Sequence, residues 1–466
     1  MSTGAIYLQG RTKANGPGSQ SCTQYTTNKL TTLLRHMPER QPYQGPAPKL
    51  VLAFDIGTTY SGVSYSILHP GEPPVISGVT RFPATDHVGG TSQIPSIVYY
   101  DLEGVARAFG GEALQESVIE RAEDEEWVKV EWWKLHLRPK NLASNHVTDQ
   151  DLPPLPTNRS AIQILSDFMG YLFRCSKTYI QESHVSGPGM WASFENNIDF
   201  VLSHPNGWEG PQQTQIRQAA VLAGLVPDSP EGQARIQLVT EGEASLHFCL
   251  STEKTAGSFK EDQGIMIINA GGETIDVNSY CMTTSPPTFQ EIAPVECRLQ
   301  GSVFVTRRAQ QLLTVKLTGS KFGTPEDVAH MTSEFDKTTK LHFNNPAEPS
   351  YIRFGTMKDR DLAFNIKSGQ LKLPGTDVAT LFEPSIAAII DAVENQRRLA
   401  TKPINSIFLV GGFAASDWLF SKLQEHIRPL NLDFYRPDSH TNKAVADGAL
   451  AFYLNHLWCG KCMVLH

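Results

Sequence analysis

Two stretches that lie far apart in the chain repeat one pattern of apolar and polar positions. Residues 50–67 (LVLAFDIGTTYSGVSYSI) and 264–281 (GIMIINAGGETIDVNSYC) each contain an apolar run, one polar residue, a short glycine-containing turn and a second apolar run. Aligning Asp55 with Asn269 also aligns the first glycines of the two turns. The pattern predicts two β-hairpins of the same kind, one in each half of the chain.

Strands and helices alternate through the rest of the chain. Apolar runs bounded by turn residues predict strands at 94–100, 199–205, 235–240 and 406–410. Apolar residues at helical spacing predict helices at 161–182, 212–224, 241–250, 381–399, 413–427 and 443–457. An amphipathic helix with a solvated acidic face is predicted over 121–137. Trp132 and Trp133 are predicted to pack at the surface of the lobe instead of forming a ligand cage. The alternation indicates the α/β class.

Composition narrows the class of protein. The chain has 466 residues, of which 40% are hydrophobic and 19% charged, as expected for two globular domains or one two-lobed unit. With a net charge of −8, the chain lacks the excess of positive charge expected of a protein that binds nucleic acid or an anionic membrane. The seven scattered cysteines argue against a disulfide framework. Without an apolar run of about 18 residues or a secretory signal, we expect a cytoplasmic protein, with the nucleus as a second compartment.

The first hairpin turn has the chemistry of a phosphate cradle. Gly57 lets the backbone approach a phosphate closely, because no Cβ intervenes. The hydroxyls of Thr58 and Thr59 and the backbone N–H groups of the turn can donate to phosphate oxygens. Asp55, at the end of the strand, can hold a hydrated Mg²⁺. The alternative is an ordinary hairpin with a glycine turn, and the turn taken alone does not decide between the two.

A second candidate contact precedes a helix near the end of the chain. In LVGGFAASDWL, Gly411 and Gly412 join a predicted strand to a predicted helix, and such a junction offers free N–H groups to a ligand. A tight strand–helix connection without a ligand explains the glycines equally well. The sequence GxxxxGK[ST] does not occur, which excludes a P-loop ATPase.

The order of these motifs carries more information than any one of them. FDIGTTYSGVSY, EGEASLHFC, INAGGETIDV and FLVGGFAASDWL follow one another between residues 50 and 457. In this order they resemble the two phosphate motifs, the connecting element and the adenosine motif of the actin, 70-kDa heat-shock protein and sugar kinase ATPase superfamily. The chain is identified as similar to the divergent heat-shock branch, the 12-type proteins and their fungal relatives.

The resemblance implies an actin-like ATPase fold, with two lobes of ribonuclease H-like core around a central nucleotide cleft. Residues 48–260 would form lobe I and residues 261–466 lobe II, after a disordered arm at 1–47. A peptide-binding domain is not expected. The ligands implied are ATP or ADP with Mg²⁺, and a protein partner or client of unknown identity.

The resemblance also implies roles for individual residues. The implied catalytic residues are Lys134, which would orient the attacking water, Glu241 and Asp276. The implied cofactor-binding residues are Gly57, Thr58, Thr59, Tyr60, Gly271, Gly272, Thr274, Gly301, Lys340, Gly411, Gly412 and Phe413, with Lys340 stacking on adenine. Asp55 would hold Mg²⁺ through water, and Asn269 stands at the position of a second metal-shell acid.

Two departures from the family pattern bear on catalysis. Asn269 replaces the first acid of the second motif, and an amide neither accepts a proton usefully nor supplies charge to Mg²⁺. Glu273 replaces its third glycine and would bring a negative charge near the terminal phosphate. Since a positioned acid or base contributes ~10²–10⁴-fold to a rate, hydrolysis could be lost while binding survives.

Three functions therefore stay open. The first is a slow Mg²⁺-dependent ATPase whose lobes close on the nucleotide. The second is a pseudo-ATPase scaffold that binds nucleotide without turnover. The third is a small-molecule kinase of the same fold, such as a sugar kinase, for which no acid motif aimed at a substrate hydroxyl is found. Cys459 and Cys462 have redox or metal spacing, but no second pair completes a zinc site.

Overall fold

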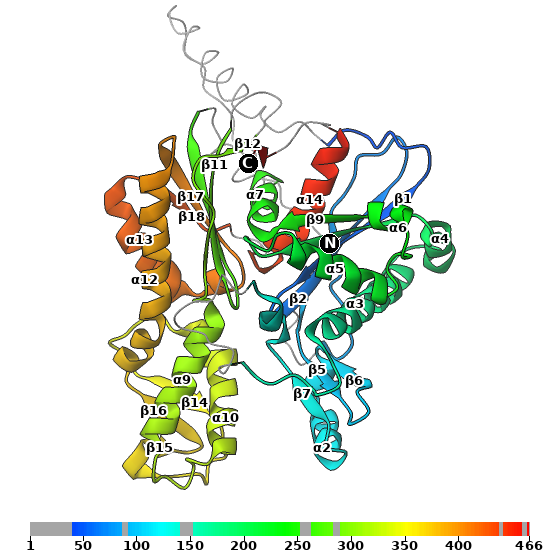
Figure 1. Ribbon diagram of the computed structural model, residues 1–466. Helices are drawn as coiled ribbons and strands as arrows, with labels where there is room; N and C mark the ends of the chain where they lie inside the picture. Colours follow the sequence, from blue (N-terminus) through cyan, green and yellow to red (C-terminus); the bar gives the residue numbers. More distant parts are fainter. Residues whose placement is uncertain are drawn as a thin grey trace, which may run out of the picture. The chain divides into compact units, whose positions relative to one another are not determined.

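Two mixed β-sheets with the same strand arrangement organise the chain (Figure 1). The computed structural model describes residues 40–85, 92–139, 152–251, 262–282, 289–437, 441–458 and 464–465. All of these residues belong to one unit, Glu39–His466.

The first sheet has the order β3(Ser77–Gly78)-β2(Tyr60–Leu68)-β1(Lys49–Ile56)-β8(Ile198–His204)-β9(Ile236–Thr240), with β4(Gln93–Pro95) also on β2. The second has the order β18(Asp433–Tyr435)-β17(Ile404–Val410)-β10(Gly264–Ala270)-β11(Ile275–Met282)-β12(Phe289–Glu291)-β19(Val464–Leu465), with β13(Glu296–Arg298) also on β11.

Each sheet is built on one of the two predicted hairpins. β1 and β2 are antiparallel, as are β10 and β11, and two parallel strands then extend each sheet from β1 or β10. Asp55 lies opposite Gly62 and Asn269 lies opposite Asp276, so the two registers agree under the alignment made from the sequence. The α/β class, the two lobes and their related cores are confirmed.

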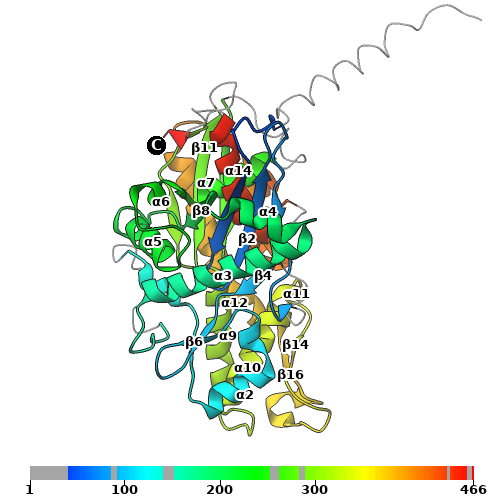
Figure 2. The same cartoon turned by 90° about the vertical axis from the view of Figure 1, so that its right-hand side faces the viewer.

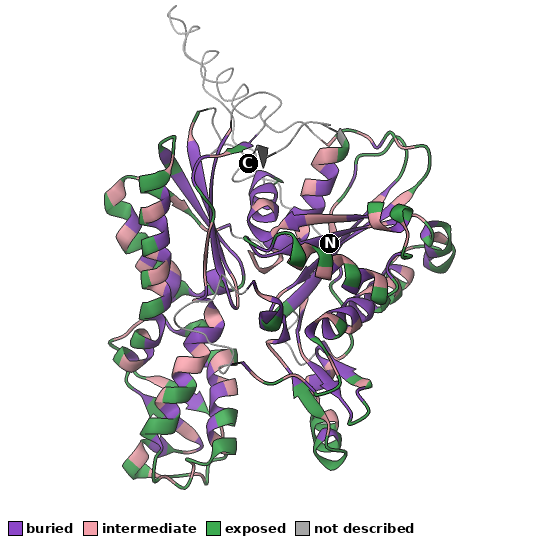
Figure 3. Cartoon of the chain, viewed as in Figure 1, coloured by how far each residue is buried: buried purple, intermediate pink, exposed green. Residues whose placement is uncertain are grey.

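In lobe I, helices cover one face of the first sheet. They are α3(Ala161–Ser183), α4(Gly187–Phe194) and α5(Pro211–Leu222), and the short helix α6(Pro230–Ala234) leads into β9. α3 begins at a capping box in which Ser160 and Gln163 exchange hydrogen bonds. Its apolar face, with Ile164 and Phe168, packs on the β1 side chains Leu52 and Phe54. Figure 3 shows the first sheet in the same view, and its strands β1 and β8 are buried along nearly their whole length.

In lobe II, the second sheet is covered by α9(Ser302–Lys316), α12(Gly375–Leu399) and α13(Asp417–Ile427). α10(Pro325–Glu334) continues into a π-helical turn (Phe335–Thr339) and α11(Lys340–His342). A small antiparallel sheet of β14(Ser350–Arg353), β15(Ile366–Lys367) and β16(Gln370–Leu373) follows them.

Two helices are exchanged between the sheets. α7(Glu241–Ser251) follows the last strand of the first sheet, yet its Leu246 and Cys249 pack with Ile265 of the second. α14(Ala444–Trp458) follows β18 of the second sheet, yet its Ala449 packs with Ala53 of the first. The two helices lie side by side between the sheets (Figures 1 and 2). Their approach is so close that a Cβ on Gly448 would lie 1.9 Å from the carbonyl oxygen of Ala244.

The helix predicted over 121–137 is wrong. α2(Glu116–Asp124) ends within it, β7(Val128–Val130) pairs with β5(Val98–Tyr100), which also pairs with β6(Ala106–Phe109), and a 3₁₀ turn follows (Trp133–Leu137). The backbone of Trp132 is left-handed, with φ of 55°. Trp133 is fully buried instead of packing at the surface, and its Nε1 donates to the carbonyl of Ser96 at 2.9 Å. The pairing of β7 with the buried strand β5 overrides the helical spacing, although only Val130 of β7 is itself buried.

The ends of the chain are described only in part. Residues 1–39 of the predicted arm, and Cys459 and Cys462, lie outside the described residues. Within residues 40–47, Tyr43 is buried and its N–H donates to the carbonyl of Glu72 at 2.8 Å. Among the helices of the described ranges, none is both long enough and apolar enough to cross a membrane.

Candidate nucleotide site

The two hairpin turns have the same internal hydrogen bond and face one cavity. The N–H of Gly57 donates to the carbonyl of Tyr60 at 3.2 Å, and the N–H of Gly271 donates to that of Thr274 at 2.9 Å. A Cβ on Gly272 would lie 2.2 Å from Oγ1 of Thr59, so the turns of the two lobes are in direct contact. The cavity between them has a volume of about 1240 Å³, ample for a nucleotide.

Most of the residues implied by the resemblance line this cavity. They are Asp55, Gly57, Thr58, Thr59, Tyr60, Lys134, Glu241, Asn269, Gly271, Gly272, Thr274, Lys340, Gly411, Gly412 and Phe413. Asp276 and Gly301 are not part of the lining. Asp276 lies behind it and accepts a hydrogen bond from Thr274 Oγ1 at 2.8 Å. Gly301 supports the second turn from behind, since its N–H donates to the carbonyl of Glu273 at 2.8 Å.

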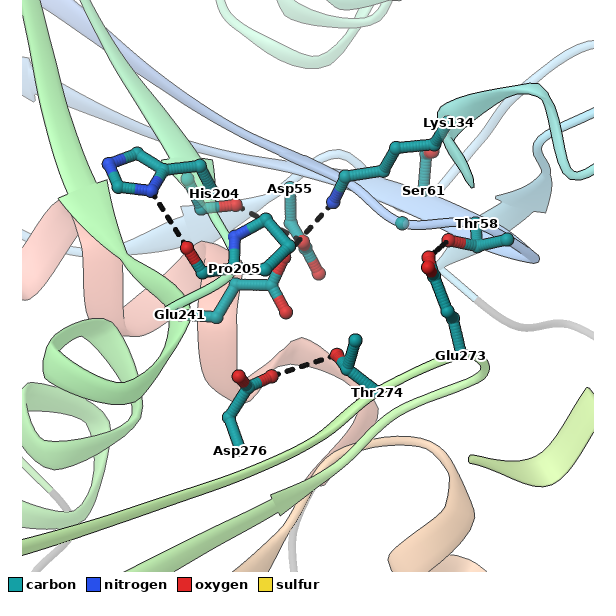
Figure 4. Close-up of polar contacts among 12 residues, drawn as sticks. Asp55, Thr58, Ser61, Lys134, His204, Pro205, Glu241, Glu273, Thr274 and Asp276 are labelled. Carbon is teal, nitrogen blue, oxygen red and sulfur yellow. Dashed lines mark hydrogen bonds and ion pairs between the residues drawn. The ribbon is translucent and has the colours of Figure 1, made fainter. Parts of the chain in front are cut away.

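A buried ion pair lies at the inner end of the cavity (Figure 4). Lys134 Nζ is 3.0 Å from Glu241 Oε1 and 5.5 Å from the centre of the Trp208 ring. Burial alone would lower the pKa of Lys134, but the carboxylates of Glu241 and Asp55 outweigh it and raise that pKa. Lys134 therefore stays charged and holds the Glu241 carboxylate in place.

The other carboxylates of the site are poorly neutralised. Burial raises the pKa of Asp55 to about 7, and the charge of Glu241 adds to the effect. Ser203 Oγ donates to Asp55 Oδ1 at 3.2 Å and partly offsets it. Burial and Glu241 also raise the pKa of Asp276 to about 7, and hydrogen bonds from Thr274 and Cys297 offset this only in part. The site therefore has more negative charge than Lys134 alone can balance.

This excess of carboxylate charge fits a divalent cation. No group of three or more His, Cys, Asp or Glu side chains in the described ranges is arranged to ligate a metal directly. A Mg²⁺ that keeps most of its waters needs only one or two carboxylates, and Asp55 at the cavity wall is the residue that would hold it. Asn269 directs its amide toward Glu241, with Nδ2 3.5 Å from Oε2, and brings no charge to a metal.

The outer part of the cavity contains a polar group that the sequence did not reveal. Asp336, in the π-helical turn, lines the cavity and accepts hydrogen bonds from Lys340 Nζ and Thr306 Oγ1. Lys340 Nζ also contacts Thr306 Oγ1 at 3.2 Å. Stacking of Lys340 on adenine stays a prediction. Asp336 and Lys340 are four residues apart, a spacing that could have identified the pair. Ser203 could have been found from its place near the end of β8, beside β1.

Comparison with known proteins agrees with this geometry. Heat shock 70 kDa protein 12A of Mus musculus is 23% identical over 456 residues, which cover 80% of this chain and 65% of that protein. The heat shock 70 kDa protein 12A of Homo sapiens gives the same identity and coverage. Human heat shock 70 kDa protein 12B is 22% identical over 466 residues, which cover 83% of this chain and 66% of that protein. The chain thus matches about two thirds of the length of these relatives. No protein-family model matches it.

These relatives support an Hsp70-like family. The chain has the two-lobed, actin-like ATPase fold of that family. The resemblance stated from the motifs is confirmed at this level, whereas the fungal branch stays a prediction. The candidate site differs from the expected pattern at Asn269 and Glu273, and both side chains are buried in it.

The paired glycines of the candidate site have different structural roles. Gly411 has φ of 93°, and a Cβ there would lie 2.4 Å from the carbonyl oxygen of Ala270. Gly412 has φ of −64°, and a Cβ would meet nothing within 4 Å. We expect Gly411→Ala to lower the free energy of unfolding by about 1–3 kcal/mol. We expect Gly412→Ala to change it by less than about 0.5 kcal/mol. Urea unfolding of both variants tests this, and equal losses would contradict it.

Stability should depend on pH through the buried acids. The pKa of Asp276 is about 7 in the folded chain, against about 4 in an unfolded chain. The folded state therefore binds the proton more tightly between these values, and stability falls as the pH rises from about 4 to 7.

Without nucleotide or Mg²⁺, Asp276→Asn should reduce this fall by up to about 1.4 kcal/mol per pH unit. Asp228→Asn, which changes an exposed carboxylate outside the cavity, is the matched control and should leave the fall between pH 5 and 7 in place. Urea titrations at each pH measure both, and equal slopes in Asp276→Asn and the unmodified chain would contradict the expectation.

Proposed function

We propose that this chain is an Hsp70-like nucleotide-binding protein that takes ATP or ADP with Mg²⁺ and closes its two lobes around it. The observation that carries the proposal is the contact of two equivalent glycine turns, one from each sheet, on one cavity that Gly411 and Gly412 also line. Phosphates held by both turns would join the lobes, so nucleotide would favour the closed arrangement. A protein partner or client would respond to this closure.

We further propose slow hydrolysis of ATP at this site. The backbone N–H groups of the turns and the hydroxyls of Thr58 and Thr59 would bind phosphate oxygens. A bound Mg²⁺ would supply positive charge to the phosphates. Lys134, held by Glu241 at 3.0 Å, would orient a water for in-line attack on the terminal phosphorus. Glu241 would accept a hydrogen bond from that water, and Asp276 would fix Thr274 from behind the cavity wall.

A pseudo-ATPase scaffold is the second candidate, and Asn269 favours it. Its Nδ2 is directed at Glu241, so the amide acts as a donor where a base would have to accept a proton. Nucleotide would then still control closure through binding alone. For either function we propose a cytoplasmic or nuclear location, because seven scattered cysteines, an odd number, do not favour a disulfide framework.

Calorimetric titration of the full chain with ATP and with ADP, each with and without Mg²⁺, tests the proposal. We expect saturable binding that strengthens with Mg²⁺. The absence of binding by either nucleotide in the presence of Mg²⁺ would reject it. Single-turnover phosphate release then separates the two candidates. Release that is lost in Asp55→Ala and Lys134→Ala would reject the scaffold, and an absence of release despite tight binding would reject the ATPase.

A further inference from the structure

Glu273 lies inside the phosphate cradle and bonds across it. It belongs to the second turn, is only 6% exposed, and accepts a hydrogen bond from the hydroxyl of Thr58 in the first turn. The two residues are 215 positions apart and come from different lobes (Figure 4). Both line the cavity. The carboxylate thus already occupies a donor that a phosphate oxygen would use.

The position of Glu273 in the second hairpin turn explains why its side chain extends to the first turn. Under the alignment of Asp55 with Asn269, Glu273 falls on Thr59, a short polar residue at the same place in the first turn. The glutamate side chain is longer and carries a negative charge. Because the turns are already in contact at Gly272 and Thr59, this side chain extends over the space between them.

The positive charge near Glu273 is committed to other carboxylates. Lys134 forms its ion pair with Glu241 and also stabilises Asp55 and Glu273. Burial raises the pKa of Glu273 to about 7; the Thr58 hydrogen bond and Lys134 partly offset this, Glu241 adds to it, and Arg138 adds a weaker attraction. A terminal phosphate placed here would bring more negative charge against Glu273 and would compete with it for Thr58. A carboxylate that bonds in this way is an internal substitute for a phosphate group.

We infer that Glu273 makes this site selective for nucleoside diphosphates over triphosphates. The inference rests on the proposed nucleotide binding and deepens it by naming the ligand class. A diphosphate leaves the place of the terminal phosphate to the Glu273 carboxylate, and the Thr58 bond between the lobes persists. A triphosphate has to displace the carboxylate and break that bond. The closed arrangement of the two lobes would then be favoured by a bound diphosphate and not by a bound triphosphate.

The test compares ADP and ATP binding by calorimetry, with Mg²⁺, on the full chain and two variants. In the unmodified chain we expect ADP to bind at least about tenfold more tightly than ATP, a free-energy difference of about 1.4 kcal/mol. Glu273→Gly should strengthen ATP binding at least about tenfold and change ADP binding less than about threefold. Glu273→Gln, which keeps the shape and removes the charge, should give a smaller gain and covers the case in which the glycine variant does not fold. Glu231→Gln, on α6 and outside the cavity lining, is the control and should change neither affinity.

The possible results separate the two proposals. ATP binding as tight as ADP binding in the unmodified chain, or variants that shift both affinities equally, would overturn the selectivity while leaving nucleotide binding intact. Failure of the unmodified chain and both variants to bind either nucleotide would reject the proposed function itself, and the selectivity with it.

Discussion

Lys134→Ala is expected to lower the free energy of unfolding by about 3–5 kcal/mol, because it leaves the buried carboxylate of Glu241 without its partner. The loss should be larger at pH 8 than at pH 5. Without Lys134, the repulsion between Glu241 and Asp55 loses the positive charge that offsets it, and protonation of Asp55 at low pH relieves that repulsion. Urea unfolding at both pH values measures the two effects.

Lys129→Ala is the matched control for this variant. Lys129 lies five residues earlier and pairs with Glu131 at 2.8 Å, but both side chains are more than one third exposed. Such a pair contributes less than about 1 kcal/mol. A loss of the same small size in Lys134→Ala, or a loss that does not change with pH, would contradict the role assigned to the buried pair.

Asn269→Asp is expected to raise single-turnover phosphate release at least about tenfold in the presence of Mg²⁺, since a positioned acid or base contributes ~10²–10⁴-fold. The new carboxylate would stand 3.5 Å from Glu241, where the amide now donates. Repulsion between the two should destabilise the metal-free variant, so its melting temperature should become dependent on Mg²⁺. Phosphate release and thermal unfolding with and without Mg²⁺ measure these effects.

Asn365→Asp adds the same charge at an exposed position outside the cavity and is expected to change neither quantity. If Asn269→Asp hydrolyses ATP no faster than the unmodified chain, Asn269 is not what limits turnover. Glu273 would then be the remaining departure from the family pattern in the second turn.

The sequence was sufficient to predict the hairpins, because their apolar runs are long and their turns are marked by glycine. The alignment of Asp55 with Asn269 even predicted the shared strand register. The failure over 121–137 has a clear cause. β7 has only three residues, and its pairing with β5 is a contact between distant segments that local spacing does not contain.

The sequence predicted the parts of the site that belong to recognisable motifs. It did not predict the contacts that the fold makes between distant motifs. The cavity-lining glycines and Lys134 were identified from the order of motifs. The bond between Thr58 and Glu273 joins two turns 215 residues apart, and the sequence suggested only that Glu273 brings charge. Asp336 was missed for the same reason, because only the fold brings its helical turn to the cavity.

The exchange of α7 and α14 has a consequence for dividing the chain. A cut between the two sheets in sequence would give two fragments, and each would retain the helix that covers the other fragment's sheet. Neither fragment could then bury the face of its own sheet alone. The two lobes are separate as binding surfaces but interdependent in folding, and two separately expressed halves would behave as complementary fragments rather than as domains.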